Sequence, residues 1–385
     1  MKTNITFAIA LVICSSIFML GCDNSNNTKE DNKAPLPIIG TPHTTDSVIY
    51  SFAFMGCNRV DRNDKGKAKA TNASSANVYA LKRIYDNLCE EKRKPDAFFF
   101  LGDLVVAEQE NLDDLKSQLK AWVELYDSTG FSDISTSGIE LVALPGNHEM
   151  LYYANYGVPH HDEWPLDGAE DVWIEHMAPY MPKDRDIITG ADSMANRSTF
   201  SFVRKNIGFI VMNTDTYNPS SAKYKHGMEG LIPTKWITQK IEEYRKDSTI
   251  KHIFVLGHKP YYVYHKAETG HNGLPEGPVL WPALRKNNVV AMLSAHVHDY
   301  QRMQPMGDST YQIIAGNGGS PGQATFFGYT TINVYASGKI ELKSKGYKIG
   351  HPYYAAPVKE ESFSIWDSTL LTPTPNANPY KPASL

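Results

Sequence analysis

Beyond residue 20 the sequence contains no apolar stretch long enough to cross a bilayer, which takes about 20 predominantly apolar residues. It also lacks a strong excess of either charge: the formal net charge is −4 at pH 7, without the basic footprint of a nucleic-acid-binding protein. No internal repeat is visible, which argues against a repeat architecture. What remains is a globular chain, and its 42% hydrophobic residues are enough to build a core.

Cysteine is scarce, with four in 385 residues, and two of the four lie near the N-terminus. There, Lys2 precedes an apolar stretch over residues 5–20 that ends in Met19-Leu20-Gly21-Cys22. A stretch of this length is typical of a signal peptide, and the small residue before the cysteine resembles the signal of bacterial lipoproteins. We expect lipid attachment at Cys22 and anchoring in the bacterial cell envelope, outside the cytoplasm. An ordinary signal peptide or an uncleaved anchor is the alternative.

The chain after this segment divides by composition. Residues 1–21 form the expected signal peptide, and residues 22–47 are polar enough to serve as a tether. Residues 48–347 contain the expected domain. Residues 348–385 form a proline-rich tail that we expect to wrap around the surface or to be mobile.

Only Cys57 and Cys89 are then left inside the domain, because Cys14 would be removed with the signal peptide. Cys57 ends the first predicted strand. Residues 77–92 predict a helix, with apolar side chains at helical spacing, and Cys89 lies in its last turn. A strand and the helix that follows it place these two positions at opposite ends of the sheet, beyond the ~7 Å reach of a disulfide. We therefore expect Cys57 to be a free thiol.

Five apolar runs are each followed by a short polar stretch. The runs cover residues 51–55, 97–101, 141–145, 253–256 and 289–294, and runs of this length predict buried strands. In open α/β sheets, ligands bind at the carboxyl ends of the strands, so the polar stretches should converge on one edge. The five stretches are Gly56-Cys57-Asn58-Arg59, Gly102-Asp103, Gly146-Asn147-His148-Glu149, Gly257-His258 and Ala295-His296-Val297-His298.

The converging side chains form a metal-ligand set. Asp103 offers a carboxylate, Asn147 an amide oxygen, and His258, His296 and His298 offer three imidazoles. This mixture suits Zn, Fe or Mn. Each residue alone has an ordinary explanation as a turn or a core histidine, but the whole set in this order favours a metal site.

The series of motifs resembles the calcineurin-like metallophosphoesterases. The run Ala295-His296-Val297-His298-Asp299-Tyr300-Gln301-Arg302 and the later Ile314-Ala315-Gly316-Asn317-Gly318-Gly319 are similar to the purple acid phosphatase branch, whose usual forms are Gly-His-x-His-x-Tyr-Glu-Arg and Gly-x-Gly-Gly. The resemblance covers residues 48–347. It implies an α/β fold, a four-layer sandwich of two mixed β-sheets flanked by helices.

The resemblance also implies a function, the metal-dependent hydrolysis of small phosphorylated substrates. In such enzymes a hydroxide that bridges two metal ions attacks phosphorus. Asp103 would bridge the metals and so belong to the catalytic residues. His148 would not bind metal but would protonate or orient the leaving oxygen. The first metal would be held by Cys57, Asp103 and His298, and the second by Asp103, Asn147, His258 and His296.

The first motif departs from the family pattern. Cys57 stands where the family has an aspartate, and a thiolate favours Zn or Fe over Mg, with Mn also possible. A branch of iron- and calcium-dependent alkaline phosphatases is similar in having a cysteine there. Arg59 cannot ligate a metal, because a guanidinium stays protonated, but it could bind a phosphate oxygen. Asn58 is a weaker candidate for a ligand or a substrate contact, and Val106 replaces the tyrosine of purple acid phosphatases.

The motifs do not separate phosphomonoesters from diesters. A phosphodiesterase acting on nucleotides or lipid head groups is therefore one alternative function. The altered first motif supports another, a catalytically weakened lipoprotein that binds phosphorylated or glycan ligands without turnover.

Two long segments border the expected site. Residues 150–198 follow His148 and contain no clear strand, and residues 259–281 follow His258. Both are rich in aromatic residues, so we expect ordered loops that form the walls of the site. Further helices are predicted over residues 112–126 and 234–245.

Overall fold

The computed structural model describes residues 46–60, 72–107, 112–154, 162–189, 197–216, 231–263, 271–305, 307–349 and 362–373. The expected signal peptide, Cys22 and the tether as far as residue 45 lie outside the described residues, as do parts of the tail. Among the helices of the described part, none is long and apolar enough for a membrane span.

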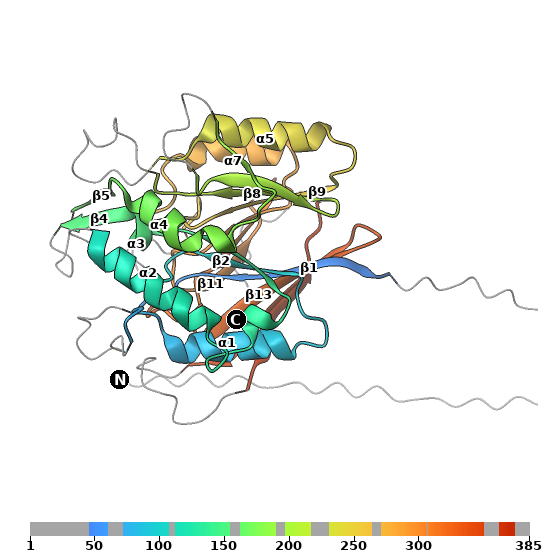
Figure 1. The fold of residues 1–385 in the computed structure, drawn as a ribbon. Helices are drawn as coiled ribbons and strands as arrows, with labels where there is room; N and C mark the ends of the chain where they lie inside the picture. The colour runs from blue at the N-terminus through green and yellow to red at the C-terminus, as the bar shows by residue number, and fades with distance from the viewer. Residues whose placement is uncertain are drawn as a thin grey trace, which may run out of the picture. The chain divides into compact units, whose positions relative to one another are not determined.

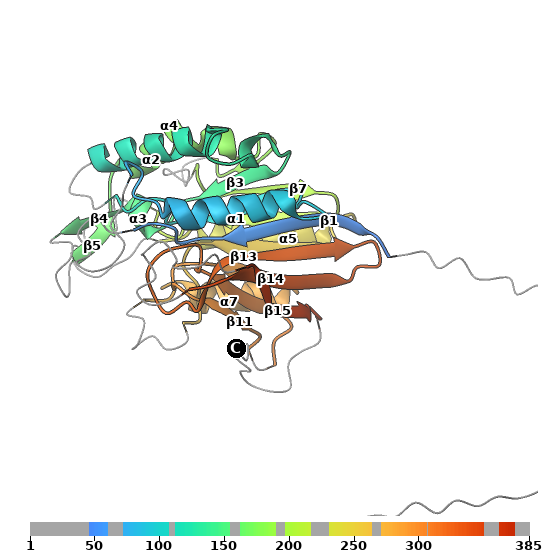
Figure 2. The same cartoon turned by 90° about the horizontal axis from the view of Figure 1, so that it is seen from below.

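The first sheet has the strand order β15-β14-β13-β1-β2-β3. Strands β1, β2 and β3 run parallel, whereas β13 pairs antiparallel with β1 and continues into an antiparallel β13-β14-β15 ribbon. Figure 2 shows β13, β14 and β15 side by side. The sheet is therefore mixed. Its strands are β1 (Val48–Met55), β2 (Ala97–Leu101), β3 (Glu140–Leu144), β13 (Phe326–Tyr335), β14 (Ile340–Lys348) and β15 (Ser364–Leu370).

The second sheet has the strand order β11-β12-β10-β9-β8-β7-β6 and is also mixed. Its four central strands β12, β10, β9 and β8 run parallel, and antiparallel strands flank them on both sides. The strands are β6 (Asp186–Ile187), β7 (Phe200–Arg204), β8 (Ile207–Met212), β9 (His252–Gly257), β10 (Ala291–Ser294), β11 (Tyr300–Met303) and β12 (Tyr311–Ala315). A separate small hairpin consists of β4 (Leu151–Ala154) and β5 (Asp162–Pro165).

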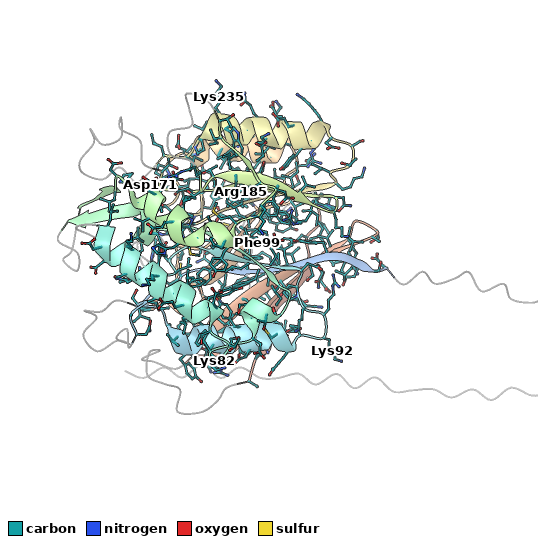
Figure 3. The ribbon with its side chains drawn as sticks, viewed as in Figure 1. Lys82, Lys92, Phe99, Asp171, Arg185 and Lys235 are labelled. Carbon is teal, nitrogen blue, oxygen red and sulfur yellow. The ribbon has the colours of Figure 1, made fainter. Side chains whose placement is uncertain are left out.

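An aromatic core joins the two sheets. The ring of Phe52 on β1 lies 5.5 Å from that of Phe99 on β2, and 5.2 Å from those of Phe209 on β8 and Phe254 on β9. Figure 3 shows Phe99 deep between the layers. Successive side chains of a strand point to opposite faces, so the neighbours of Phe52 and Phe99 face the helices instead. Both faces of β1 and β2 are thus apolar and buried, as their continuous apolar runs predict.

Helices cover the outer face of each sheet. Helices α1 (Val78–Glu90), α2 (Leu112–Asp127) and α4 (Ala169–Met177) pack on the first sheet, and α5 (Thr234–Lys246) and α7 (Gly277–Lys286) pack on the second. Figure 1 shows α5 and α7 on one side of the two sheets and α1 on the other. The predicted four-layer sandwich is confirmed. Three short elements complete the set: α3 (Asn147–Met150), η1 (Ile134–Thr136) and η2 (Ala178–Tyr180).

The structure corrects the expectation for the two long segments. Residues 150–198 contain the β4-β5 hairpin, α4, η2 and β6, and residues 259–281 include the beginning of α7. Helix α4 has only nine residues and becomes stable by burying Trp173 and Met177 against α2 and its sheet. A helix that short depends on such packing, which the sequence pattern does not reveal.

The C-terminal tail also contributes to the fold. Residues 364–370 form β15, which pairs antiparallel with β14 at the edge of the first sheet. No strand is predicted there from the sequence, because most of its side chains are exposed and its apolar pattern is weak. Cys57 follows β1, and Cys89 is near the end of α1; both are free thiols.

Candidate metal centre

Loops from both sheets meet at the carboxyl ends of the parallel strands. The backbone N–H of Cys57, after β1, donates to the carbonyl of Gly102, after β2, at 2.9 Å. A Cβ atom added to Gly102 would lie 2.5 Å from the backbone nitrogen of Gly146, after β3, and 2.8 Å from Nδ1 of His258, after β9. The approach is so close that these two glycines cannot carry a side chain without displacing the loops.

Three of the predicted metal ligands have a left-handed backbone. The φ angles are +58° at Cys57, +58° at Asp103 and +66° at His296. Residues with a Cβ rarely adopt this conformation, which costs roughly 1–3 kcal/mol at each position and persists only where the surroundings hold it. Such strain is typical of functional sites.

Acceptor atoms converge where the loops meet. Oδ1 of Asn147 lies 2.9 Å from Nε2 of His258 and 3.0 Å from Nδ1 of His296. Nε2 of His258 also lies 3.2 Å from Oδ1 of Asp103. All four side chains are buried. The structure therefore brings together the residues that were assigned to the second metal.

The ring of His258 is oriented for metal binding. Its Nδ1 lies 2.7 Å from the carbonyl oxygen of Leu101, and because a carbonyl can only accept, Nδ1–H is the donor. In the neutral ring, Nε2 then carries a lone pair and faces the oxygens of Asn147 and Asp103. Lone pairs that face one another in a buried site repel unless a cation or a proton lies between them.

The ring of His298 is held in the same way. Its Nδ1 donates to the carbonyl of Pro321, and its Nε2 is buried without a hydrogen-bond partner among the described residues. Burial lowers the pKa of His298 well below its ordinary value, and the charge of Arg59 lowers it further, so the ring is neutral. Histidines that bind metals commonly donate their other ring N–H to a carbonyl in this manner.

Cys57 adds a sulfur atom. Ligand atoms of Cys57, Asp103 and His258 all lie within 4.8 Å of one another. The thiol is fully buried, and its pKa is raised by burial and by the charge of Asp103, so a nearby cation is needed to make it a thiolate. This grouping differs from the sequence assignment, which placed His298 beside Cys57 and His258 at the other metal. His258 lies next to the shared carboxylate and can reach either position.

The other two residues of the first motif have different partners. Nε of Arg59 lies 3.4 Å from Oδ2 of Asp103, so its charge faces the shared carboxylate. Burial alone would raise the pKa of Asp103, but His258, His148 and Arg59 together lower it below its ordinary value. The amide nitrogen of Asn58 donates to the carbonyl of Gly318 at 2.8 Å, which attaches the first motif to the glycine-rich loop.

His148 lies beside the carboxylate of Asp103, and its backbone N–H donates to Oδ1 of Asp103 at 3.3 Å. Its Nδ1–H donates to the carbonyl of Val106 at 2.8 Å. Burial and the charge of Arg59 lower the pKa of His148 to about 3. In the neutral ring Nε2 is therefore an acceptor, free of a proton.

Glu149 anchors the loop of Asp103, a role that the sequence analysis did not assign. Its Oε1 accepts from the backbone N–H groups of Leu104 and Val105, and its Oε2 from those of Asp103 and Gly146, at 2.7–3.0 Å. Burial and the charge of Asp103 act to raise the pKa of Glu149, and these donors oppose that shift. Four donors on two oxygens favour the ionised, acceptor-only carboxylate. Its place as the last residue of Gly-Asn-His-Glu is the signal that could have identified it.

His271 is a second residue that the sequence analysis did not single out. Its ring centroid lies 4.9 Å from that of His296 and 5.0 Å from that of His298. Burial is the main reason why the pKa of His296 lies well below its ordinary value, and the neighbouring His271 lowers it further. A lone histidine in a loop carries no sequence signal, and only folding brings this one to the site.

The donor set fits metal ions. The site offers buried oxygen, imidazole nitrogen and sulfur atoms, with ring nitrogens turned inward by backbone carbonyls. Oδ1 of Asn58 and Nε2 of His296 and of His298 are buried without hydrogen-bond partners in the described part of the chain. Such orphaned acceptors are costly unless a cation or a donor satisfies them. Mixed O, N and S ligands suit Zn and Fe best.

Comparison with known proteins agrees with the fold. The model of the calcineurin-like phosphoesterase family matches residues 51–300. A dimetal phosphatase from Danio rerio is similar in structure, with a TM-score of 0.52 at 10% identity over 85% of this chain and 100% of that chain. PhoD is similar with a TM-score of 0.54 at 12% identity, over 85% of this chain and 70% of that chain. At these identities the structural likeness establishes the fold alone. Among curated protein sequences there is no significant match.

The glycine contacts predict that Gly146→Ala disrupts the site. The added methyl group would press against Oδ1 of Asp103 and lie 2.9 Å from Cε1 of His258. We expect a loss of most bound metal, measured as metal ions per chain by elemental analysis. Gly130→Ala is the control, since its Cβ would meet only a serine oxygen at 3.8 Å. Equal metal content in both variants would show that the loops can separate without cost.

Proposed function

Since the chain belongs to the calcineurin-like phosphoesterase family, we propose that it is a two-metal phosphatase of the purple acid phosphatase-like kind, acting on small phosphorylated substrates. The observation that carries this proposal is the convergence of Asp103, Asn147 and His258, whose facing polar atoms a cation would satisfy. The family performs phosphoester hydrolysis, and the finer assignment rests on these side chains.

The proposed metal sites share Asp103. Cys57 and His298 would complete one site, with His258 within reach, and Asn147, His258 and His296 the other. Metal ions bound there would supply an activated water and neutralise charge on the phosphoryl oxygens. Zn or Fe is favoured by the thiol, and Mn is possible.

Arg59 is placed to serve the substrate. Its guanidinium stays protonated at all relevant pH values, and its Nε lies 3.4 Å from Oδ2 of Asp103. A guanidinium can bind phosphate oxygens in a bidentate manner. Arg59 would therefore contribute both to phosphate binding and to the charge balance of the buried carboxylate.

His148 is proposed to handle the leaving-group proton. Because its Nδ1–H is engaged by Val106, any exchangeable proton sits on Nε2. With a pKa of about 3 in the substrate-free protein, the ring gains that proton only as the pH falls or as an anionic substrate raises its pKa. Turnover that depends on this proton should rise toward acidic pH, provided that the metal ligands remain deprotonated.

The deciding experiment is a panel of phosphomonoesters and phosphodiesters assayed with the purified protein, alongside metal analysis. Turnover of monoesters that depends on metal supports the proposal. Preference for diesters would instead favour a phosphodiesterase acting on nucleotides or lipid head groups. Metal binding without turnover of any ester would indicate a weakened binding protein, which the raised pKa of Cys57 and the position of Arg59 motivate.

The role of His148 predicts that His148→Ala reduces turnover by about 10²–10⁴-fold, the usual contribution of a general acid, while metal content stays near the wild-type value. Kinetics and elemental analysis on the same sample check both. His252→Ala is the matched control, because His252 lies at the opposite end of the strand that leads to His258. Loss of metal in His148→Ala would make it a ligand rather than an acid.

The position of Cys57 predicts a loss of metal in Cys57→Ala. In Cys57→Asp we expect the two-metal site to remain but to prefer harder metal ions, Mn or Mg. In the wild type, bound metal should also shield the thiol from alkylation, and chelation should expose it. Metal ions per chain and alkylation rates are the measurements. Cys89→Ala, at the other free thiol, is the control. Full metal occupancy in Cys57→Ala would show that Cys57 is not a metal ligand and only fills space in the core.

We also propose that the protein is lipid-anchored through Cys22 in the bacterial envelope, outside the cytoplasm. Support comes from the apolar stretch over residues 5–20 and from the Gly21-Cys22 pair at its end. Cys22→Ala should abolish lipid attachment and move the protein into the soluble fraction, because the tether is polar. Firm membrane association of that variant in fractionated cells would point to an uncleaved anchor instead.

A further inference from the structure

An ionic contact joins the edges of the two sheets. Asp367 lies on β15, at the edge of the first sheet, and Tyr300 and Arg302 lie on β11, at the edge of the second. The hydroxyl of Tyr300 donates to Oδ2 of Asp367 at 2.7 Å. Arg302 donates through Nε to Oδ2 at 2.7 Å and through Nη2 to Oδ1 at 3.2 Å. One carboxylate thus binds two side chains of β11.

The strand that carries Asp367 is held in a defined register. Ser344 pairs with Asp367 and Lys345 with Ile365, so Trp366 is an extra residue in the ladder. The indole stacks on Phe326, with ring centroids 4.7 Å apart and planes at 4°, and its Nε1 donates to the carbonyl of Gly346 at 3.1 Å. A bulge of this kind changes the direction in which the neighbouring side chain points, and here that side chain is Asp367.

The loop ahead of β11 carries two of the proposed metal ligands. It runs from Ala295 to Asp299 between β10 and β11 and contains His296, whose φ is +66°. Two short hydrogen bonds of 2.7 Å lie within the loop. Val297 N–H donates to the carbonyl of Ala295, and Asp299 N–H donates to the carbonyl of Val297. A strained loop keeps its shape only if both ends are fixed.

The far end of this loop depends on β11, which is a weak anchor by itself. Strand β11 has four residues and, within the described part of the chain, pairs with β12 alone. Besides the backbone bonds from Gly316 to Asp299 and from Ala324 to His298, both of 3.0 Å, Asp367 supplies side-chain contacts to a strand that begins two residues after His298. Tyr300 and Arg302 are both largely buried against it.

We propose that Asp367 is a positioning residue for metal binding, which holds β11 through Tyr300 and Arg302 and so fixes the orientation of His296 and His298. This inference rests on the proposed function in one respect, namely that these histidines bind metal. Burial alone would raise the pKa of Asp367, but the hydrogen bonds from Arg302 and Tyr300 and the charge of Arg302 together lower it, so the carboxylate is ionised at neutral pH. Outer residues that orient metal ligands typically contribute 10–100-fold to metal affinity.

The test is Asp367→Asn in the full chain, because asparagine keeps the shape but loses the bidentate acceptor for Arg302. Zn²⁺ and Mn²⁺ affinities are measured by competition with a chromogenic chelator, well below the melting temperature. We expect affinity to fall by about 10-fold or more. Hydrogen exchange of residues 295–303 in the chelated protein is the second readout, and we expect it to accelerate.

Two further variants separate positioning from general stability. Asp184→Asn removes a carboxylate that accepts from Nη1 of Arg204 on β7, the strand next to the other edge of the second sheet, and should leave both readouts unchanged. Tyr300→Phe removes a single hydroxyl without a change in volume and should produce a smaller shift of the same sign. If Asp367→Asn does not fold, Tyr300→Phe replaces it as the test variant.

The outcomes are distinguishable. Unchanged metal affinity and unchanged exchange in Asp367→Asn, or in Tyr300→Phe if that variant alone folds, would overturn the positioning role. A melting temperature lowered to the same extent as in Asp184→Asn, with both readouts unchanged, would show that β15 only stabilises the fold. If the wild type binds neither metal, the proposed function fails, and the exchange readout alone decides whether Asp367 orders the loop.

Discussion

The site depends on one electrostatic constraint, the enclosure of facing acceptor atoms in a buried space. Nε2 of His258 lies 2.9 Å from Oδ1 of Asn147 and 3.2 Å from Oδ1 of Asp103, so in the neutral ring its lone pair faces two oxygens. Without a cation or a proton between them, these atoms repel one another in a low dielectric. The fold must therefore supply the energy that holds these atoms together, and it does so through the backbone around them.

That energy comes from main-chain groups that orient the ligands. Carbonyls of Leu101 and Pro321 each accept a ring N–H and turn the opposite nitrogen inward, and Glu149 gathers four backbone N–H groups of the loops that carry Asp103 and Asn147. These partners offset the strain of the left-handed residues at the strand ends. Because each of these partners is a backbone group of the fold, the fold itself orients the side chains of the site.

The two sheets contribute unequally to this arrangement. Asp103 and Asn147 come from parallel strands buried on both faces, where the aromatic core around Phe52 fixes the strand positions. His296 and His298 come from a loop that ends in the short edge strand β11, so their placement depends on an additional contact with Asp367. The coupling of the two sheet edges thus bears directly on the chemistry proposed for the site.

Much of this could be predicted from the sequence, because strands β1, β2 and β9 are apolar runs and α1 has helical spacing, which are local patterns. The order of polar stretches after these strands likewise indicated that Asp103, Asn147 and His258 would meet, since parallel strands end at one edge of a sheet. Only the tertiary structure decided which ring nitrogen faces inward, because the partners, such as Pro321 for His298, are distant in sequence. The same holds for the grouping of Cys57 with His258, the approach of His271, and the strand of Asp367. These features arise from contacts between remote segments, which no local periodicity encodes.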